Sequence, residues 1–344
     1  RTAIDMPPTV DTAPRPLALT MGEPAGVGGE LTLRAWASAR GRTGPFFAID
    51  DPDRLRALAS HLGIDTPVEE ISDPAEAAAL FDRALPVLAE HLPAPVIPGT
   101  PDPANAGAVV HAIERAVRLS LDGAAAGLVT NPIQKSVLYA AGFKHPGHTE
   151  YIAELCGGDE PVMMLACDAL RAVPVTVHIS LRDAVAGLTT QAIVAKGRIT
   201  AAALTRDFGI DNPRLAVAGL NPHGGEDGAL GTEDRDIVAP AVALLRAEGI
   251  DATGPAPPDT LFSPRARQRY DAALCMYHDQ ALIPVKALDF DGGVNVTLGL
   301  PIVRTSPDHG TALDIAGTGK ASEQSLVAAM VTARLIAANR ARGG

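Results

Sequence analysis

The chain alternates short apolar segments that have strand character with helical segments along most of its length. Strands are predicted at residues 17–20, 46–50, 127–130, 162–166, 173–178, 214–219, 272–276 and 294–298. Helices are predicted from about 30, over 75–91, from 105 or 106 to 121, from about 133, and over 151–155, 182–207, 233–248, 263–269 and 322–340. This alternation favours βαβ units, hence an α/β fold with a mainly parallel sheet that some antiparallel pairing extends.

The composition fits a folded protein of about two domains. The 344 residues are 47% apolar and 20% charged, but only 3% aromatic, so aliphatic strands and Ala-rich helices must form the core. At about 150 residues per domain, this length suggests two domains. Residues 1–15 are rich in Pro, Thr and Asp and are expected to form a disordered tail.

Charge and hydropathy argue against several kinds of partner. A net charge of −11 with few aromatic side chains does not suit nucleic acid, which needs clustered Lys and Arg. No apolar run approaches the roughly 20 residues that span a bilayer, and the N-terminal tail lacks the apolar centre of a signal peptide. The dispersed Cys156, Cys167 and Cys275 fit reduced thiols, so a cytoplasmic protein without membrane or nucleic-acid partners is expected.

Three widely spaced histidines each follow a strand-like segment: His178, His223 and His278. A side chain at the end of a buried strand faces the crevice where open α/β sheets bind their ligands. Three neutral imidazoles that converge there would form a metal site with room for substrate oxygens. The alternative is three unrelated histidines in the core or at the surface, and the intervals alone do not decide between them.

A glycine-rich loop follows the first predicted strand, with Gly22, Gly26, Gly28 and Gly29. It matches neither G-x-G-x-x-G nor the P-loop pattern, so it is either a nucleotide contact or a tight connection between strand and helix. The carboxylate of Glu23 argues against direct contact between this loop and phosphate.

Other polar residues are candidates for binding an anion. Thr149 is predicted to cap the helix 151–155, with His148 beside the exposed N–H groups as a phosphate contact or as a plain loop residue. Lys286 and Arg304 are expected to be partly buried and to need an anionic partner. That partner is either a substrate phosphate or carboxylate, which an arginine can bind with two hydrogen bonds, or a nearby aspartate, for which the candidates are Asp289, Asp291 and Asp308.

The segment 308–321 joins a His-Gly turn, an acidic residue and two further glycines, directly before a helix. It resembles the nucleotide-binding loop of the isocitrate and isopropylmalate dehydrogenases, which hold NAD without a Rossmann fingerprint. The resemblance implies nucleotide contacts from His309, Gly310, Thr311, Ala312 and Asp314.

From about residue 17 to residue 330, the chain resembles the 4-hydroxythreonine-4-phosphate dehydrogenase family of pyridoxal 5′-phosphate synthesis. The motifs that carry the resemblance lie at residues 22–26, 147–150, 219–223, 259–262, 276–280, 295–301, 304–306 and 308–312. It implies a homodimer of isocitrate-dehydrogenase-like fold whose two α/β/α domains enclose a cleft, with the active site at the subunit interface. An outer nucleotide-binding domain is then expected at 16–122 plus 296–344, and a central metal-site and dimerisation domain at 123–295.

The same resemblance implies roles for individual residues. A divalent metal would bind His178, His223 and His278, shared between subunits; three imidazoles suit zinc, cobalt or nickel better than magnesium. The substrate would contact five residues, namely His148, Thr149, Lys286, Asn295 and Arg304. Lys286 is also a catalytic candidate, together with Asp259 and Asp279, either of which would accept the alcohol proton or orient a metal histidine.

The expected reaction is NAD- or NADP-dependent oxidation of a small phosphorylated substrate, 4-phosphohydroxy-L-threonine, to a β-keto acid that then loses carbon dioxide. Relatives that act on sugar-acid phosphates or aromatic cis-diols leave the substrate open, and a three-histidine metal hydrolase is the alternative from another enzyme class. A phosphometabolite-binding protein without turnover is a third possibility. One departure from the family is Gln134, where many members have a histidine; an amide does not titrate near neutrality.

Overall fold

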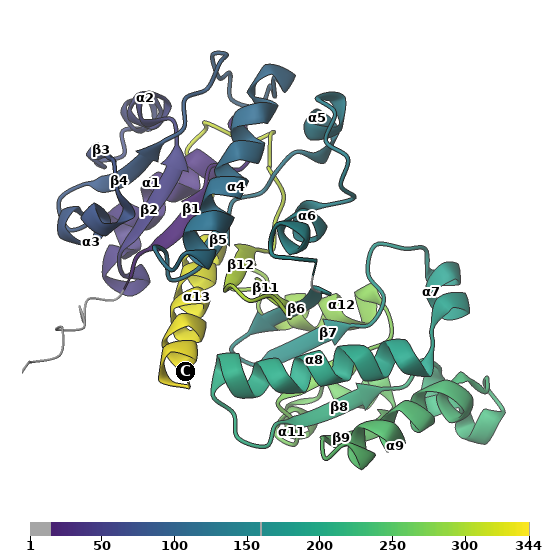
Figure 1. The fold of residues 1–344 in the computed structure, drawn as a ribbon. Coiled ribbons are helices and arrows are strands. Elements are labelled where there is room, and N and C mark those ends of the chain that lie inside the picture. Colours follow the sequence, from purple (N-terminus) through teal and green to yellow (C-terminus); the bar gives the residue numbers. More distant parts are fainter. Residues whose placement is uncertain (1–14, 159, 344) are drawn as a thin grey trace, which may run out of the picture.

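The computed structural model describes residues 15–158 and 160–343. Its strands form one twelve-stranded sheet in the order β3-β4-β2-β1-β5-β12-β11-β6-β7-β10-β8-β9 (Figure 1). In chain order, the strands are β1 Leu17–Thr20, β2 Phe46–Asp50, β3 Val68–Ile71, β4 Leu85–Ala89, β5 Leu128–Thr130, β6 Val162–Cys167, β7 Leu170–Pro174, β8 Arg214–Ala218, β9 Asp251–Ala256, β10 Ala272–Cys275, β11 Val294–Leu298 and β12 Arg304–Pro307.

The sheet consists of two parallel halves that run in opposite directions. Strands β1 to β5 and β12 are parallel to one another, and so are β7 to β10. Between these halves, β11 pairs antiparallel with β12 and β6, and β6 pairs antiparallel with β7. The expected mainly parallel sheet with some antiparallel pairing is therefore confirmed.

Helices cover both faces of the sheet (Figure 1). The helices are α1 Gly28–Thr43, α2 Pro52–Leu62, α3 Ala77–Leu80, α4 Ala106–Leu121, α5 Lys135–Ala140, α6 His148–Leu155, α7 Leu181–Gly187, α8 Thr190–Phe208, α9 Ala239–Ala247, α10 Pro258–Leu261, α11 Pro264–Arg267, α12 His278–Leu288 and α13 Gln324–Arg342, with short turns η1 Pro74–Glu76, η2 Pro103–Asn105, η3 Pro222–Gly228 and η4 Asp234–Val238.

Alternate side chains of the strands pack into different cores. In β10, Leu274 packs with residues of α8, α9 and α13 on one face, whereas Ala273 and Cys275 pack with α12 on the other. In β1, Leu19 likewise joins the first core and Ala18 joins the core that contains α4 and α6. Strands buried on both faces have continuous apolar sequences, which is why they could be predicted from the sequence.

The predicted helix over 75–91 is wrong in its second half. Helix α3 ends at Leu80, and residues 85–89 form β4, which pairs on both sides with β3 and β2. The alanines favour a helix locally, but the Leu-Pro-Val-Leu-Ala segment gains more from pairing and burial inside the sheet. Two other predicted boundaries also differ from the structure. Strand β7 ends at Pro174 instead of 178. The predicted helix 182–207 is two helices, α7 and α8, and Thr189 caps α8.

The predicted tail 1–15 lies outside the described residues except for Arg15, and the proposed division into domains stays a prediction. Among the described residues, no helix combines the length and the apolar character needed to cross a membrane.

Candidate active site

A buried arginine without an anionic partner lies at the junction of the two sheet halves. Arg304, the first residue of β12, is 4% exposed. Its Nη1 donates hydrogen bonds to Thr297 Oγ1 at 2.8 Å and Thr149 Oγ1 at 3.2 Å, and its Nη2 donates to Thr130 Oγ1 at 3.0 Å. Its Nε is buried without a partner. Burial lowers the pKa of Arg304 to about 10 although Glu150 opposes this effect, so the guanidinium needs an anion.

The strand register places further polar groups on the same face. Asn295 in β11 lies opposite Ser306 in β12. Along β12, Ser306 is two residues after Arg304, and along β11, Asn295 is two residues before Thr297. Because side chains alternate along a strand, all four point to one face of the sheet. The buried Oδ1 of Asn295 has no hydrogen-bond partner in the structure. This face therefore offers both a cation and an unsatisfied amide to a polar ligand.

Helix α6 brings His148 next to this arginine, and Lys135, the first residue of α5, lies beside the start of α6. Burial, and then the positive charges of Arg304 and Lys135, hold the pKa of His148 well below its usual value, so the imidazole is neutral at pH 7. Its Nε2 is buried without a partner. Gly147 precedes it, and a Cβ there would lie 2.5 Å from Glu150 Oε2 and 3.4 Å from Lys135 Nζ. A side chain at Gly147 would therefore displace the charged ends of Glu150 and Lys135 at the first turn of α6.

The predicted capping role of Thr149 is wrong. The N-cap of α6 is Gly147, and Thr149 lies inside the first turn without a side-chain capping bond. Its hydroxyl accepts a hydrogen bond from Arg304 instead. A cap prediction uses only local sequence, whereas Arg304 is 155 residues away and reaches Thr149 through the fold.

Of the three predicted metal histidines, two lie close together. The rings of His178 and His278 have their centroids 5.9 Å apart. His223 lies in η3 with a left-handed backbone (φ 53°), at the start of six consecutive residues with positive φ, 223–228. Among the described residues of one chain, no group of three His, Cys, Asp or Glu side chains is placed to hold a metal ion.

The carboxylate of Asp279 contacts one of these histidines. Its Oδ1 lies 2.7 Å from Nδ1 of His278, the first residue of α12. This contact favours a proton on Nδ1 and leaves Nε2 as the free nitrogen, as in other histidine ligands that a carboxylate orients. Burial, and then the charges of Lys135 and His278, lower the pKa of His178. The lowered pKa favours the neutral form of His178, which is the form that binds metals.

The other predicted catalytic residues have different surroundings. Asp259 is exposed on α10, which packs against η3 beside His223. Lys286 forms an ion pair with Asp308 at 2.9 Å and lies 5.9 Å from the ring centroid of Phe290. The anionic partner of Lys286 in the single chain is thus an aspartate, one of the two alternatives considered for it. Arg304 forms no ion pair with any of the described residues.

The loop 308–321 packs against the first glycine-rich loop. Val27 N donates a hydrogen bond to Thr311 O at 3.0 Å, and a Cβ on Gly26 would lie 2.8 Å from the same oxygen. Ala312 has a positive φ of 44°, and Gly310 and Asp314 are exposed. The buried Nε2 of His309 lacks a partner. The departure from the family, Gln134, accepts a hydrogen bond from Thr311 Oγ1 at 3.0 Å.

A cavity of about 700 Å³ opens beside these loops. Its lining includes Pro24, Gly26, Leu92, Pro98 and Gly317. Its volume and mostly apolar lining are those of a small-molecule site.

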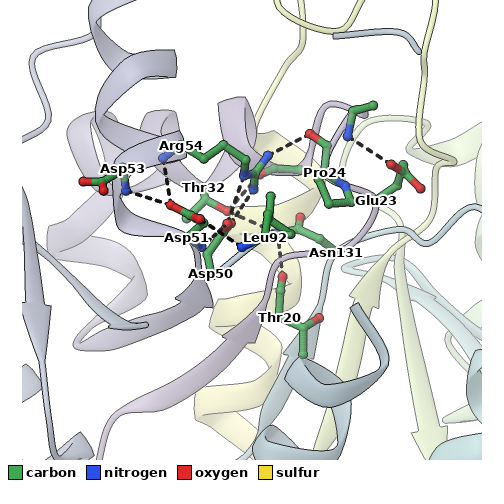
Figure 2. A network of polar contacts seen from close by, with 12 residues as sticks. Thr20, Glu23, Pro24, Thr32, Asp50, Asp51, Asp53, Arg54, Leu92 and Asn131 are labelled. Atoms are coloured by element: carbon green, nitrogen blue, oxygen red, sulfur yellow. Dashed lines mark hydrogen bonds and ion pairs between the residues drawn. The ribbon is translucent and has the colours of Figure 1, made fainter. Parts of the chain in front are cut away.

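A polar network fixes one wall of this cavity (Figure 2). Arg54 binds both oxygens of buried Asp50, at 3.0 and 2.5 Å, and donates to Pro24 O at 2.8 Å. Asp51 accepts from Leu92 N at 3.0 Å, and Asn131 Nδ2 donates to Thr20 O at 3.0 Å. Because the wall is tied at these points, the cavity is a formed feature of the fold.

Sequence reasoning missed several residues of the site. Thr130 and Thr297 are neutral hydroxyls inside ordinary strands, and only the fold shows that they bind Arg304. Lys135 carried the only available signal, because it directly follows the unusual Gln134 in a loop after a strand.

The single mixed sheet with helices on both faces defines the chain as an α/β protein, and the pocket around Arg304 is its candidate site for a small anionic ligand. Comparison with known proteins is more specific. The sequence matches the family described as "Pyridoxal phosphate biosynthetic protein PdxA" over residues 43–333. It is 56% identical over 332 residues to the 4-hydroxythreonine-4-phosphate dehydrogenase of Caulobacter vibrioides, which covers 95% of this chain and 98% of the relative. The chain therefore belongs to this family.

Solved structures agree with that assignment. The 4-hydroxythreonine-4-phosphate dehydrogenase of Klebsiella pneumoniae superimposes with a TM-score of 0.87 at 38% identity, over 95% of this chain and 99% of that one. A terephthalate 1,2-cis-dihydrodiol dehydrogenase from Burkholderia xenovorans has a TM-score of 0.62 at 27% identity, over 91% and 95% of the two chains. The resemblance found in the sequence and the fold class are both confirmed.

Proposed function

We propose that the protein oxidises 4-phosphohydroxy-L-threonine to 2-amino-3-oxo-4-phosphooxybutanoate, which decarboxylates to 3-amino-2-oxopropyl phosphate. The observation that carries this proposal is Arg304, a buried guanidinium whose protein partners are three neutral hydroxyls. A substrate phosphate or carboxylate would supply the missing negative charge. The relatives named for this substrate point to the same chemistry.

In this proposal, the residues around Arg304 hold the substrate. Neutral His148 and the hydroxyl of Thr149 contact the anionic end together with Arg304, and the free Oδ1 of Asn295 accepts from an amino or hydroxyl group. Lys286 would exchange its bond with Asp308 for a substrate oxygen. Asn295 and Arg304 come from strands β11 and β12, His148 and Thr149 from the first turn of α6, and Lys286 from the last turn of α12, so the substrate is held on rigid elements.

The donors for a metal fit an imidazole-type site. Asp279 leaves Nε2 of His278 free, His178 lies beside it, and burial and nearby charges favour neutral His178. With His223, these are the proposed ligands of a zinc or cobalt ion, whereas magnesium would suit them poorly. A metal held by these imidazoles would supply Lewis-acid chemistry that favours loss of the proton of the substrate hydroxyl, and NAD would supply the hydride acceptor.

We propose that the site is shared between two copies of the chain. Exposed apolar side chains follow each of the three histidines: Ile179 and Leu181 after His178, Leu230 after His223, and Ile283 and Phe290 after His278. Exposed apolar side chains of this size are typical of interfaces. A second copy would cover them and bring a further histidine into reach of the pair His178 and His278.

The nucleotide would lie between the two glycine-containing loops, with the cavity beside Gly26 and Gly317 open to it. Unpartnered Nε2 of His309, together with Gly310, Thr311, Ala312 and Asp314, would contact NAD or NADP. The structure favours neither cofactor. A cytoplasmic location is part of the same proposal, because the family is described as one of pyridoxal phosphate biosynthesis.

For the alcohol proton, the two aspartates now have distinct proposed roles. Asp279 is bonded to His278 and would orient it, while Asp259, exposed beside the His223 segment, is the better candidate acceptor. Because proton transfer to a positioned carboxylate contributes about 10²- to 10⁴-fold, Asp259→Asn should reduce kcat by that order.

The test is a coupled measurement of NADH and phosphate. With NAD, zinc or cobalt and 4-phosphohydroxy-L-threonine, the protein should produce NADH, which is followed by its absorbance at about 340 nm. The variant His223→Ala should stay folded but produce no NADH. Phosphate release without NADH would identify a metal hydrolase instead. Equal NADH production from His223→Ala would contradict the proposed metal site.

A further inference from the structure

A chain of buried hydrogen bonds joins the ends of strands β7, β10 and β8. Thr176 Oγ1 donates to Met276 O at 2.9 Å. Met276 N donates to Gln280 Oε1 at 2.6 Å, and Gln280 Nε2 donates to Gly219 O at 2.8 Å. Gln280 is 7% exposed and lies in α12. We call these three bonds the Gln280 relay.

The relay lies directly before the three proposed metal ligands. Its contact points are two residues before His178, two before His278 and four before His223. The three strands otherwise pair only up to β7 Pro174, β10 Cys275 and β8 Ala218. The relay therefore connects the three strand ends to one another close to the points where the chain leaves the sheet to present each imidazole.

The chemistry of Gln280 suits this position better than any other side chain. One end of its amide must accept from an N–H and the other must donate to a carbonyl, and only an amide of this length does both. A carboxylate at the same place would put a negative charge beside Gly219 O, and an apolar side chain would leave two buried backbone groups without partners.

Asp234 continues the anchoring along the His223 segment. It is 1% exposed, and its carboxylate accepts from Leu220 N at 2.6 Å, Asn221 N at 3.0 Å and Asn221 Nδ2 at 3.0 Å. The next residues include the run of positive φ that begins at His223. A backbone in this strained region persists only where its surroundings hold it.

We infer that Gln280 is a positioning residue that sets the relative placement of the three histidine-bearing segments, and that Asp234 fixes the one that carries His223. The inference rests on the proposed metal site, but it concerns residues that do not touch the metal. The inference also applies if one metal site combines histidines from two copies of the chain, because the Gln280 relay positions the three segments within each copy.

The test compares Gln280→Glu with Gln324→Glu in the full-length, metal-depleted protein. Gln324 is exposed at the start of α13, so its variant makes the same chemical change away from the relay. Cobalt(II) binding is measured by calorimetry and by the visible spectrum of the bound ion. Gln280→Glu should bind cobalt at least about 10-fold more weakly than Gln324→Glu and the wild type, the usual effect of losing a group that orients ligands.

Kinetics separate positioning from general damage. In Gln280→Glu, kcat should fall about as much as cobalt affinity, while KM for NAD stays within about twofold, because the relay does not touch the loop 308–321. Cobalt binding equal to that of the wild type would overturn the inference, and so would parallel losses of kcat and NAD binding.

Asp234→Asn keeps the inference testable if Gln280→Glu does not fold. It should weaken cobalt binding and keep the thermal transition, and unchanged cobalt affinity in this variant would overturn its role. A wild-type protein that does not bind cobalt would remove the proposed metal site and this inference together. A wild type that binds, with variants that bind equally well, would remove the inference alone.

Discussion

Replacing Arg304 by methionine separates a ligand-binding arginine from a structural one. Burial lowers the pKa of Arg304 from its ordinary value to about 10, which corresponds to about 3 kcal/mol of unfavourable free energy for the charged form. Methionine removes this cost. It also removes the hydrogen bonds to Thr130, Thr149 and Thr297, worth about 1 kcal/mol each. The two contributions nearly cancel, so the unliganded variant should unfold within a few degrees of the wild type.

Added phosphate should distinguish the two proteins. At 100 times its Kd, an anion that binds only the folded state stabilises it by about 2.7 kcal/mol, which raises Tm by about 5 °C for a chain of this size. Scanning fluorimetry with inorganic phosphate should show this rise for the wild type and for the control Arg42→Met, whose arginine is exposed in the last turn of α1. Arg304→Met should show almost none.

Two results would refute the reasoning about Arg304. One is an equal phosphate response in Arg304→Met, which would place the anion elsewhere. The other is a loss of more than about 3 kcal/mol in the unliganded variant, the penalty expected when one member of a buried ion pair is removed. Such a loss would mean that Arg304 already has a structural anionic partner.

Further predictions concern the metal, His148 and the nucleotide loop. Dialysis against a chelator should abolish NADH production, and zinc or cobalt should restore it; full activity without metal would contradict the imidazole site. Because the pKa of His148 is lowered, the unfolded state binds a proton below about pH 6.5 that the folded state does not. Stability should therefore fall by up to about 1.4 kcal/mol per pH unit below that value, and less in His148→Asn, as denaturation at pH 7 and pH 5.5 would measure. Gly26→Ala pushes its Cβ against Thr311 O, so KM for NAD should rise about 10-fold with little change in KM for substrate.

Features that depend on local pattern could be predicted from the sequence. Strands such as β1, β2, β8 and β10 are short continuous apolar runs, and the helix that begins after Asp51 has both a capping aspartate and a proline in its first turn. Strand β4 could not be predicted, because its Ala-rich surroundings favour a helix and only its pairing with β2 and β3 decides the outcome.

Residues of the candidate site could be predicted from the sequence where burial of their charged group requires a partner. A buried arginine needs an acceptor, so Arg304 could be selected without a structure. Thr130 and Gln280 carry no such demand, and their partners lie 174 and 61 residues away in the chain. The choice among aspartates for Lys286 was equally open, because three lie near it in the sequence and only the fold selects Asp308.

Charge links the anion pocket to the proposed metal ligands. Burial, and then positive charges that include Lys135, lower the pKa of both His148, beside Arg304, and His178, beside His278. Burial and this shared positive field thus favour neutral His148 and neutral His178, as a hydrogen-bonding contact and a metal ligand respectively require. The positive charges of Lys135 and Arg304 would oppose the binding of a metal cation nearby until an anionic substrate neutralises these charges. Substrate and metal should therefore strengthen each other's binding by the same factor, because coupling between two binding sites is reciprocal.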